Sequence, residues 1–241
     1  MNGFDFTGRR VLVTGATSGI GAAIAQAFLE GGAEVAITGT RAAARDYAAA
    51  LPGADYRRFQ LGDHASTEAL AASFDRLDIL INNAGATSAP EDFDAAIDVN
   101  LKGVHRLTTA LAPLLERSDM PGGGAVVSIV SMMAIFGNSI FPGYSAAKAG
   151  LLLLTRSLAQ GWGPRGIRVN AVPPGPVRTA MTARFADDPV YGPGTAQRMA
   201  LGRWGDPADI AGPVLFLASP AAAFVTGECL VASGGYMIAE A

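Results

Sequence analysis

A tyrosine and a lysine four residues apart form the first pattern in this chain that indicates chemistry. Tyr144 and Lys148 belong to the run Tyr-Ser-Ala-Ala-Lys, and on a helix that spacing places both side chains on one face, about one turn apart. A tyrosine phenol has a pKa near 10, whereas a neighbouring ammonium favours the phenolate and lowers that pKa. We therefore expect the pair to donate and accept a proton near neutral pH. The same spacing is common on ordinary exposed helices, so this interpretation depends on the rest of the chain.

Two further polar residues, Ser131 and Asn100, precede the pair in the chain. Ser131 directly follows an apolar run at 125–130, which predicts a buried strand. Ligands of open α/β sheets bind beyond the carboxyl ends of the strands, so the Ser131 hydroxyl is expected to reach the same oxygen as Tyr144. Asn100 lies inside a predicted helix over 94–116, where a lone asparagine is otherwise a kink or an exposed residue.

A glycine-rich turn after the first predicted strand, 10–14, indicates a nucleotide site. The turn reads Gly-Ala-Thr-Ser-Gly-Ile-Gly over 15–21, and an alanine-rich helix is predicted over 22–30. Glycines let backbone N–H groups approach a pyrophosphate, and the helix dipole favours the anion. A plain tight turn is an equally common origin of such a sequence. If the turn binds a nucleotide, the expected contacts are Gly15, Thr17, Ser18, Gly19, Ile20 and Gly21.

The end of the second predicted strand, 34–38, bears on the choice of cofactor. Folds that prefer NAD usually place an acidic residue there, where it binds the ribose 2′-hydroxyl. This chain continues instead with Gly-Thr-Arg, so Thr40 and Arg41 offer a hydroxyl and a cation for a 2′-phosphate. The pattern favours NADP(H), with NAD(H) as the alternative, since Arg41 also fits a solvated residue at the start of a helix.

The remaining elements alternate, and this alternation predicts the fold class. It indicates an α/β protein: a doubly wound, mostly parallel sheet of seven strands with helices on both faces, forming a single Rossmann domain over residues 1–241. Periodicity weakens over 178–205, which we expect to be a mobile substrate lid. The other expected strands are 56–61, 78–82, 125–130, 167–171 and 228–231, and the other expected helices are 65–74, capped by Asp63, 94–116, 144–160 and 207–218.

Composition argues against several classes of function. Half of the residues are hydrophobic and 16% are charged, which suits a large core, and a net charge of −3 gives no support for binding nucleic acid or an anionic membrane. A single cysteine and two distant histidines indicate no metal site. The chain has no signal-peptide pattern and no apolar run of membrane-spanning length, so we expect a cytoplasmic protein without a membrane partner.

Together these motifs resemble the short-chain dehydrogenase/reductase family over nearly the whole chain, particularly its 3-oxoacyl-carrier-protein reductases and related ketone reductases. The resemblance adds Asn-Asn-Ala-Gly at 82–85, Pro-Gly-Pro-Val-Arg-Thr at 174–179 and the glycine pair at 234–235. It implies an NAD(P)(H)-dependent oxidoreductase that interconverts a ketone and a secondary alcohol by hydride transfer. In that role Tyr144 would be the general acid/base and Lys148 would lower its pKa while binding the nicotinamide ribose. The substrate oxygen would then meet Ser131, and Asn100 would hold a water in a proton relay.

The family resemblance also implies further cofactor contacts and an assembly. The cofactor contacts are Leu61 near the adenine, Asn83, Ala84 and Gly85 at the ribose, Pro174, Gly175, Val177 and Thr179 near the carboxamide, together with Tyr144 and Lys148. Three departures stand out: Gln60-Leu61 replaces a common Asp-Val pair, Ser18 stands where NADP-dependent members often have a basic residue, and Ser233 replaces a common aspartate. Relatives pair the helices expected at 94–116 and 144–160, so we expect a homotetramer or, failing that, a dimer.

The segments around the catalytic candidates predict a neutral, medium-sized hydrophobic ketone as substrate. Met-Met-Ala-Ile-Phe follows Ser131, and no lysine or paired arginine lies between Ser131 and Tyr144 to hold a carboxylate near the reacting carbon. A more distant acidic group would meet the lid arginines, which keeps a 3-oxoacyl-thioester substrate as an alternative; these are Arg178, Arg184, Arg198 and Arg203. A halohydrin-dehalogenase-like lyase is disfavoured by the intact glycine turn and Lys148. A non-catalytic nucleotide-binding protein is the remaining alternative.

Overall fold

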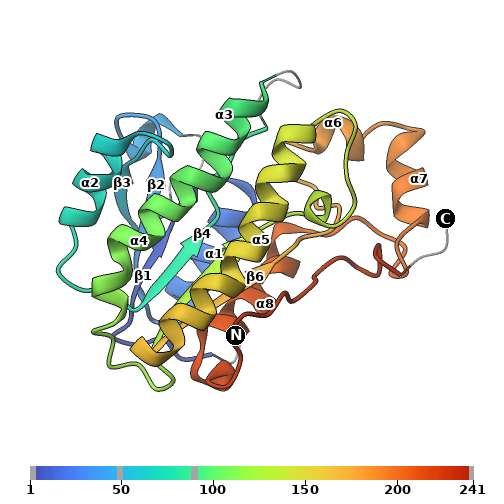
Figure 1. Cartoon of the computed structure of the whole chain (residues 1–241). Coiled ribbons are helices and arrows are strands. Elements are labelled where there is room, and N and C mark those ends of the chain that lie inside the picture. The colour runs from blue at the N-terminus through green and yellow to red at the C-terminus, as the bar shows by residue number, and fades with distance from the viewer. Residues whose placement is uncertain (1–3, 48–50, 88–91, 239–241) are drawn as a thin grey trace.

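Six parallel strands form the sheet at the centre of the molecule (Figure 1). The computed structural model describes residues 4–47, 51–87 and 92–238. Their order across the sheet is β3-β2-β1-β4-β5-β6, so the winding direction reverses between β1 and β4 and the α/β, doubly wound expectation is confirmed. The strands are β1 Arg10–Val13, β2 Glu34–Gly39, β3 Asp55–Arg58, β4 Ile79–Asn82, β5 Gly124–Ile129 and β6 Ile167–Val172.

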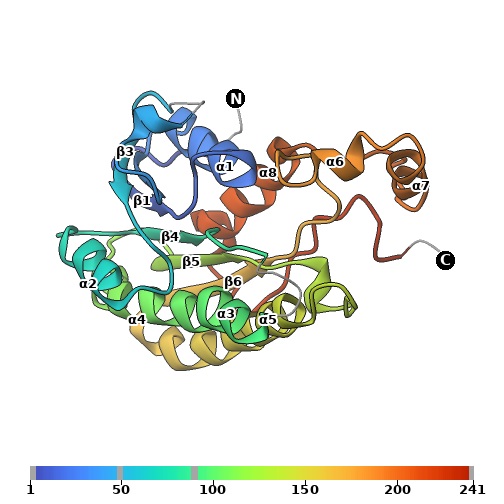
Figure 2. The ribbon, with the colours of Figure 1, turned by 90° about the horizontal axis from the view of Figure 1, so that it is seen from above.

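Helices cover both faces of this sheet, as Figure 2 shows from above. One face carries α1 (Gly19–Glu30) and α8 (Pro207–Ala218), which pack against each other. The other face carries α2 (His64–Ala72), α4 (Val104–Leu115) and α5 (Pro142–Trp162), with the short α3 (Phe93–Ile97) next to α5. Two short helices, α6 (Ala183–Ala186) and α7 (Tyr191–Gln197), lie beyond the sheet near the described end of the chain. In the described part of the chain, no helix combines the length and apolarity that crossing a membrane requires.

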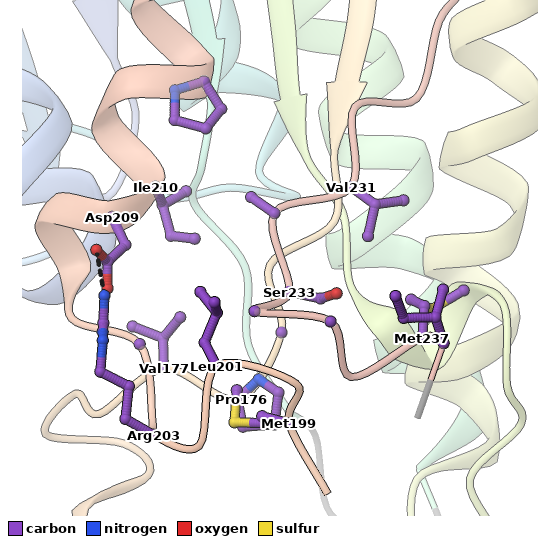
Figure 3. A pocket seen from close by; sticks show the side chains of 17 residues that line it. Pro176, Val177, Met199, Leu201, Arg203, Asp209, Ile210, Val231, Ser233 and Met237 are labelled. Atoms are coloured by element: carbon purple, nitrogen blue, oxygen red, sulfur yellow. Dashed lines mark hydrogen bonds and ion pairs between the residues drawn. The ribbon is translucent and has the colours of Figure 1, made fainter. Parts of the chain in front are cut away.

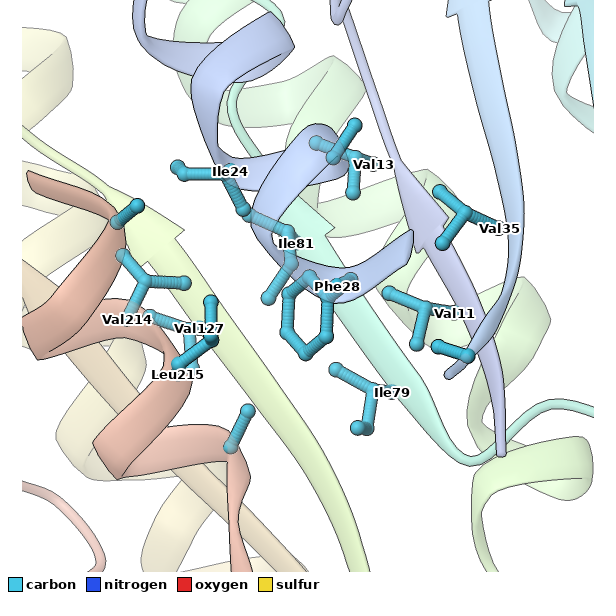
Figure 4. Close-up of a cluster of buried hydrophobic side chains, with 14 of the residues drawn as sticks. Val11, Val13, Ile24, Phe28, Val35, Ile79, Ile81, Val127, Val214 and Leu215 are labelled. Atoms are coloured by element: carbon cyan, nitrogen blue, oxygen red, sulfur yellow. The ribbon is translucent and has the colours of Figure 1, made fainter. Parts of the chain in front are cut away.

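A hydrophobic core fills each side of the sheet. Figure 4 shows Phe28 of α1 among Val11, Ile79 and Ile81 of the central strands, with Leu215 of α8 completing the cluster. The six residues of β5 and the six of β6 are all buried, because both of their faces are covered by helices. This two-sided burial explains why the strands read as continuous apolar runs rather than as alternating patterns.

The predicted seventh strand is absent from the sheet as a regular element. The segment 228–232 does run parallel to β6: Ala171 N donates to Glu228 O at 2.9 Å, and Gly175 N donates to Ala232 O at 2.9 Å. Between these bonds stands Pro173, which has no N–H to donate to the facing carbonyl. The pairing is therefore reduced to isolated bridges, and the sheet has six strands instead of seven.

The predicted helix over 94–116 is also interrupted. It consists of α3, a π-helical turn at Asp98–Gly103 and α4. The cause is the Asn100 side chain, whose Nδ2 donates to the Ala96 carbonyl at 3.0 Å and so competes with the backbone ladder.

A buried guanidinium closes the far end of α8. Arg168 of β6 donates to the carbonyls of Leu217 and Ala218 at 2.6 and 3.2 Å, and these two residues end the helix. It also donates to the carbonyls of Gly122, Ser219 and Ala222. The last carbonyls of a helix lack intrahelical donors, so this one side chain supplies the partners that α8 needs.

Candidate active site

Ser131 and Tyr144 meet at the carboxyl edge of the sheet. Ser131 lies two residues beyond the end of β5, in extended backbone, and its Oγ accepts from Met133 N at 3.1 Å at the start of a short 3₁₀ turn. Tyr144 comes from the first turn of α5, where Pro142 occupies one of the first two helical positions. The two side chains are near enough for the Ser131 hydroxyl to lower the pKa of the Tyr144 phenol. The predicted neighbours are thus in contact, although twelve residues separate them in the chain.

Lys148 lies one turn along α5 and is almost completely buried. Its side chain is 3% exposed, its Nζ donates to the Ile129 carbonyl at 2.9 Å, and the same Nζ lies 5.6 Å from the centre of the Tyr144 ring. Burial lowers the pKa of Lys148 from 10.5 to about 8. No carboxylate in the described part of the chain compensates this charge.

The expected low pKa of Tyr144 is not found in the protein without cofactor. Burial raises the pKa of the Tyr144 phenol above 10, and the nearby Ser131 hydroxyl offsets only part of that increase. Lys148 does not counteract it, because its ammonium is itself destabilised by burial and is directed at the Ile129 carbonyl. Tyr144 is therefore protonated at neutral pH, which suits a proton donor.

Asn100 is fully buried and joins the π-helical turn to the loop after β4. Its Oδ1 accepts from Ala86 N at 3.1 Å, and its Nδ2 donates to the carbonyls of Ala86 and Ala96 at 2.9 and 3.0 Å. Gly85 lies between Asn100 and Lys148: a Cβ there would be 2.8 Å from Asn100 Oδ1 and 3.5 Å from Lys148 Nζ. Both polar groups therefore approach the position that a side chain at Gly85 would occupy.

The glycine turn packs tightly against the end of β4. The hydroxyl of Thr14 accepts from the backbone N–H groups of Asn83 and Ala84, each at 3.0 Å. Gly15 has φ +64°, and a Cβ there would lie 2.8 Å from the Ala84 Cα. Gly21 likewise faces the Asn83 side chain, whose Nδ2 donates to the carbonyls of the turn. The glycine turn, which is predicted to bind the pyrophosphate, and residues 83–85, which are predicted to bind the ribose, therefore pack together as one unit.

Other predicted cofactor residues surround this unit, with one exception. Ser18 caps the start of α1 in extended backbone, Ile20 is partly buried, and the Thr17 methyl faces Gly39 at the end of β2. A Cβ on Gly19 would lie 3.4 Å from the Thr179 side chain. In the segment that begins at Pro174, Gly175 packs against Ser233 and the Val177 side chain is buried. Leu61 is the exception, because it is 9% exposed and packs in the core around α2 and α4.

Two cations flank the end of β2. Arg41 is exposed, with its guanidinium 4.8 Å from the centre of the Tyr47 ring, and its backbone N–H donates to the Tyr47 hydroxyl at 2.9 Å. Arg58 pairs in register with Gly39, and its Nε donates to the Thr40 carbonyl at 3.3 Å. No carboxylate pairs with either arginine in the described ranges.

The predicted lid, 178–205, starts and ends at one closed base. Arg178 N donates to Gly205 O at 2.8 Å, and Gly205 N donates to Pro176 O at 2.9 Å. Two ion pairs reinforce this base, Arg178 with Asp187 at 3.0 Å and Arg203 with Asp209 at 2.7 Å. These pairs occupy two of the four lid arginines.

A cavity of about 580 Å³ lies between this base, α8 and the C-terminal segment (Figure 3). Val177, Met199, Arg203, Asp209 and Met237 are among the residues around it. None of the four predicted catalytic residues lines this cavity. It lies apart from those four residues, although Gly175 and Val177, which were predicted to contact the cofactor, are among its lining residues.

Comparison with known proteins identifies the family. Residues 15–237 match a family described as enoyl-(acyl carrier protein) reductase, and 38% of residues are identical to a D-threitol dehydrogenase of Mycolicibacterium smegmatis over 98% of this chain and 96% of that protein. The chain belongs to the short-chain dehydrogenase/reductase family. The 3-oxoacyl-[acyl-carrier-protein] reductase of Escherichia coli is 37% identical over 97% of this chain and 100% of its own. A solved gluconate 5-dehydrogenase from Burkholderia cenocepacia, in complex with NADP and tartrate, has a TM-score of 0.88 at 30% identity, with 98% of each chain covered.

As a short-chain dehydrogenase/reductase, the chain is an NAD(P)-dependent oxidoreductase, and its residues fit a dinucleotide. The turn packs this closely only because Gly15 and Gly21 have no side chains, and α1 begins beside it without a side-chain cap from Ser18, which suits an anion at the helix N-terminus. Sequence reasoning missed Thr14 and Arg58. Thr14 directly precedes the glycine turn, and this position could have indicated its role in the sequence. The position of Arg58 beside the end of β2 follows only from the register of β3 on β2.

Proposed function

We propose that this enzyme interconverts a ketone and a secondary alcohol, with Tyr144 as the general acid/base. The observation that carries the proposal is the contact between Tyr144 and Ser131, with Lys148 one turn away and the glycine turn at the same sheet edge. Both hydroxyls donate to one point, where negative charge would grow on a carbonyl oxygen during reduction. The nicotinamide supplies or accepts the hydride when it is bound.

The protonation states favour reduction at neutral pH. The Tyr144 phenol holds its proton because burial raises its pKa, so it can donate to the carbonyl oxygen as the hydride arrives. Oxidation of the alcohol requires the phenolate first and should therefore be favoured at higher pH. Lys148 and Asn100 both approach Gly85, where Lys148 would bind a ribose hydroxyl and Asn100 would hold a water of a proton relay.

NADP(H) is the proposed cofactor. Thr40, Arg41 and Arg58 gather at the end of β2, where a ribose 2′-phosphate would lie, and the described residues offer no acidic side chain that holds either arginine. Guanidinium groups bind phosphate through charge-assisted hydrogen bonds, whereas the 2′-hydroxyl of NAD(H) would leave two cations without an anion. The solved relative that carries NADP supports this preference.

The proposed substrate has an apolar body beside the reacting carbonyl. Three large apolar side chains of the loop between Ser131 and Tyr144 remain exposed in the structure, and no cation stands among them: these are Ile135, Phe136 and Ile140. Such a wall favours a medium-sized cyclic or aryl ketone over a short keto acid. A 3-oxoacyl thioester is the second candidate, favoured by the similarity to the Escherichia coli reductase.

We also propose that the enzyme is a homotetramer, or else a dimer, assembled through α4 and α5. Leu153 is 63% exposed near the middle of α5, and burial of such apolar surface between helices would stabilise a pair of subunits. Sedimentation at micromolar concentration measures this directly, and a monomer there would contradict the proposal.

Removing one hydroxyl tests the proposed chemistry. Tyr144→Phe should leave the fold and NADPH binding intact, because the ring stays in place, while turnover falls at least about a hundredfold. NADPH oxidation with a panel of aryl and cyclic ketones gives the rate, and quenching or enhancement of NADPH fluorescence gives the binding. Near-normal turnover in this variant would show that Tyr144 is not the proton donor. Absence of turnover in the unchanged enzyme with every ketone would favour a non-catalytic role.

A further inference from the structure

Three segments that are distant in the chain meet around the ring of Tyr236. This tyrosine follows the glycine pair at 234–235, beyond the segment that runs alongside β6. Its ring lies 6.4 Å from the ring of Phe136 in an edge-to-face arrangement. The guanidinium of Arg198, at the end of α7, lies 5.0 Å from the centre of the same ring. Tyr236 thus connects the loop that follows Ser131 with the lid.

The backbone fixes this arrangement. Leu201 N donates to the Gly234 carbonyl at 3.0 Å, and a Cβ on Gly234 would lie 3.5 Å from the Met199 side chain. Met199 is buried, so the end of the lid is anchored on the C-terminal segment directly after Arg198. The backbone that carries Arg198 is therefore fixed by its packed neighbour Met199, and the guanidinium lies beside the Tyr236 ring.

Among the lid arginines, Arg198 differs from the rest. Arg178 and Arg203 are each paired with an aspartate through two hydrogen bonds, so their N–H groups are occupied. Arg184 lies over Phe185 at 4.5 Å, and that ring pairs with Tyr191 inside the lid. Arg198 is the lid cation that meets the wall beside the catalytic serine and, among the described residues, has no carboxylate partner.

We propose that Arg198, held on Tyr236, binds a carboxylate at the end of the substrate remote from the ketone. The guanidinium makes no hydrogen bond or ion pair among the described residues, so its N–H groups would be available for bidentate contact with an acid. Phe136 and Tyr236 would form the apolar wall between that acid and the carbonyl held by Ser131 and Tyr144. This inference rests on the proposed ketone reduction and replaces the neutral substrate expected from sequence with one that is apolar near the carbonyl and acidic at its far end.

The test uses a rigid pair of ligands, 4-acetylbenzoate and the neutral 4-acetylbenzamide. Their dissociation constants are measured by calorimetry with the Tyr144→Phe enzyme saturated with NADPH, so that no turnover interferes. The acid should bind more tightly than the amide. Arg198→Gln should abolish that preference, a change of about tenfold in the ratio of the two constants, because it removes a charge-assisted contact.

Arg184→Gln is the matched control, since it removes an equally exposed lid cation that also lies on an aromatic ring. It should keep the preference for the acid, and Arg198→Lys should restore part of it. Equal binding of acid and amide by the parent enzyme, no measurable binding of either, or an unchanged preference in Arg198→Gln would each overturn the proposal. The proposed chemistry is judged separately, by ketone-dependent NADPH oxidation in the enzyme that retains Tyr144.

Discussion

Replacing Lys148 by methionine should make the cofactor-free protein more stable while removing its activity. The lysine is 3% exposed and no carboxylate in the described residues neutralises it, so its charge is held in the protein at a cost. Methionine has a similar length, carries no charge and adapts to irregular surroundings. Catalysis should fall sharply, because the proposed contact with the ribose and the proton relay both need the amine.

The magnitude follows from the pKa of the buried amine. A lysine pKa that falls from 10.5 to about 8 on folding corresponds to about 3 kcal/mol of destabilisation near neutral pH. The substitution leaves the Ile129 carbonyl without the bond it accepts from Nζ, which costs about 1 kcal/mol. The free energy of unfolding should therefore rise by about 2 kcal/mol at pH 7, or about 5 °C in Tm for a chain of this size.

The sign of the pH dependence gives a second check. Between the folded pKa of about 8 and the unfolded value of 10.5, the unfolded chain carries a proton on Lys148 that the native protein has lost. The destabilisation of the folded protein by the buried ammonium is therefore complete below about pH 8 and decreases as the pH rises from about 8 to 10.5. The advantage of Lys148→Met should accordingly be greatest at pH 7 and disappear by about pH 9.5.

Urea unfolding followed by circular dichroism at pH 7 and pH 9.5 measures both quantities in the absence of cofactor. Lys102→Met is the natural control, because Lys102 is the other lysine in the chain and is exposed in an ion pair with Asp98 at 2.7 Å. This control should gain no stability at either pH. A Lys148→Met protein that is less stable than the unchanged protein at pH 7 would refute the argument that Lys148 is a destabilising buried charge.

Three further substitutions test other parts of the structure. Arg41→Ala should raise the KM for NADPH more than that for NADH, and equal effects on the two would contradict a 2′-phosphate contact. Gly85→Ala should lower kcat at least about tenfold and destabilise the protein by about 1–3 kcal/mol, because the new methyl group would press on Asn100 and approach Lys148. Unchanged kinetics would show that catalysis does not require the close approach of Asn100 and Lys148 to Gly85. Arg168→Met should lower the free energy of urea unfolding by about 3 kcal/mol, since carbonyls at the end of α8 lose their donors, and an unaffected midpoint would remove Arg168 from that role.

Local patterns predicted the parts of the site that depend on spacing within one element or turn. The glycine turn, the Tyr144–Lys148 spacing and the position of Ser131 after a strand all follow from periodicity, and the structure places them at one edge of the sheet. Parallel strands bring their carboxyl ends together, so a correct order of strands and helices was enough to expect that convergence.

Features that arise from contacts between distant segments were not predictable in this way. The π-helical turn depends on Asn100 competing for the Ala96 carbonyl, and the broken seventh strand depends on which N–H group Pro173 lacks. The high pKa of Tyr144 depends on how completely the folded chain removes water around it. The partner of Arg198 is a tyrosine 38 positions later, and no period in the sequence connects the two.

Hydrogen bonds between its own two ends close the base of the predicted lid, 178–205, so this segment can be exchanged as a unit. Arg178 N donates to the Gly205 carbonyl, and Gly205 N donates to the Pro176 carbonyl. These bonds hold the two ends of the segment in the same place next to the sheet when the residues between them change. Changing the length of a loop with fixed ends costs little free energy, because closure entropy grows only slowly with length. Changes over 180–198 can therefore leave the nucleotide turn, which Thr179 contacts at Gly19, and the predicted proton-transfer residues unchanged. A lid transplanted from a relative between these same two ends should fold on this scaffold and carry its own substrate selectivity with it.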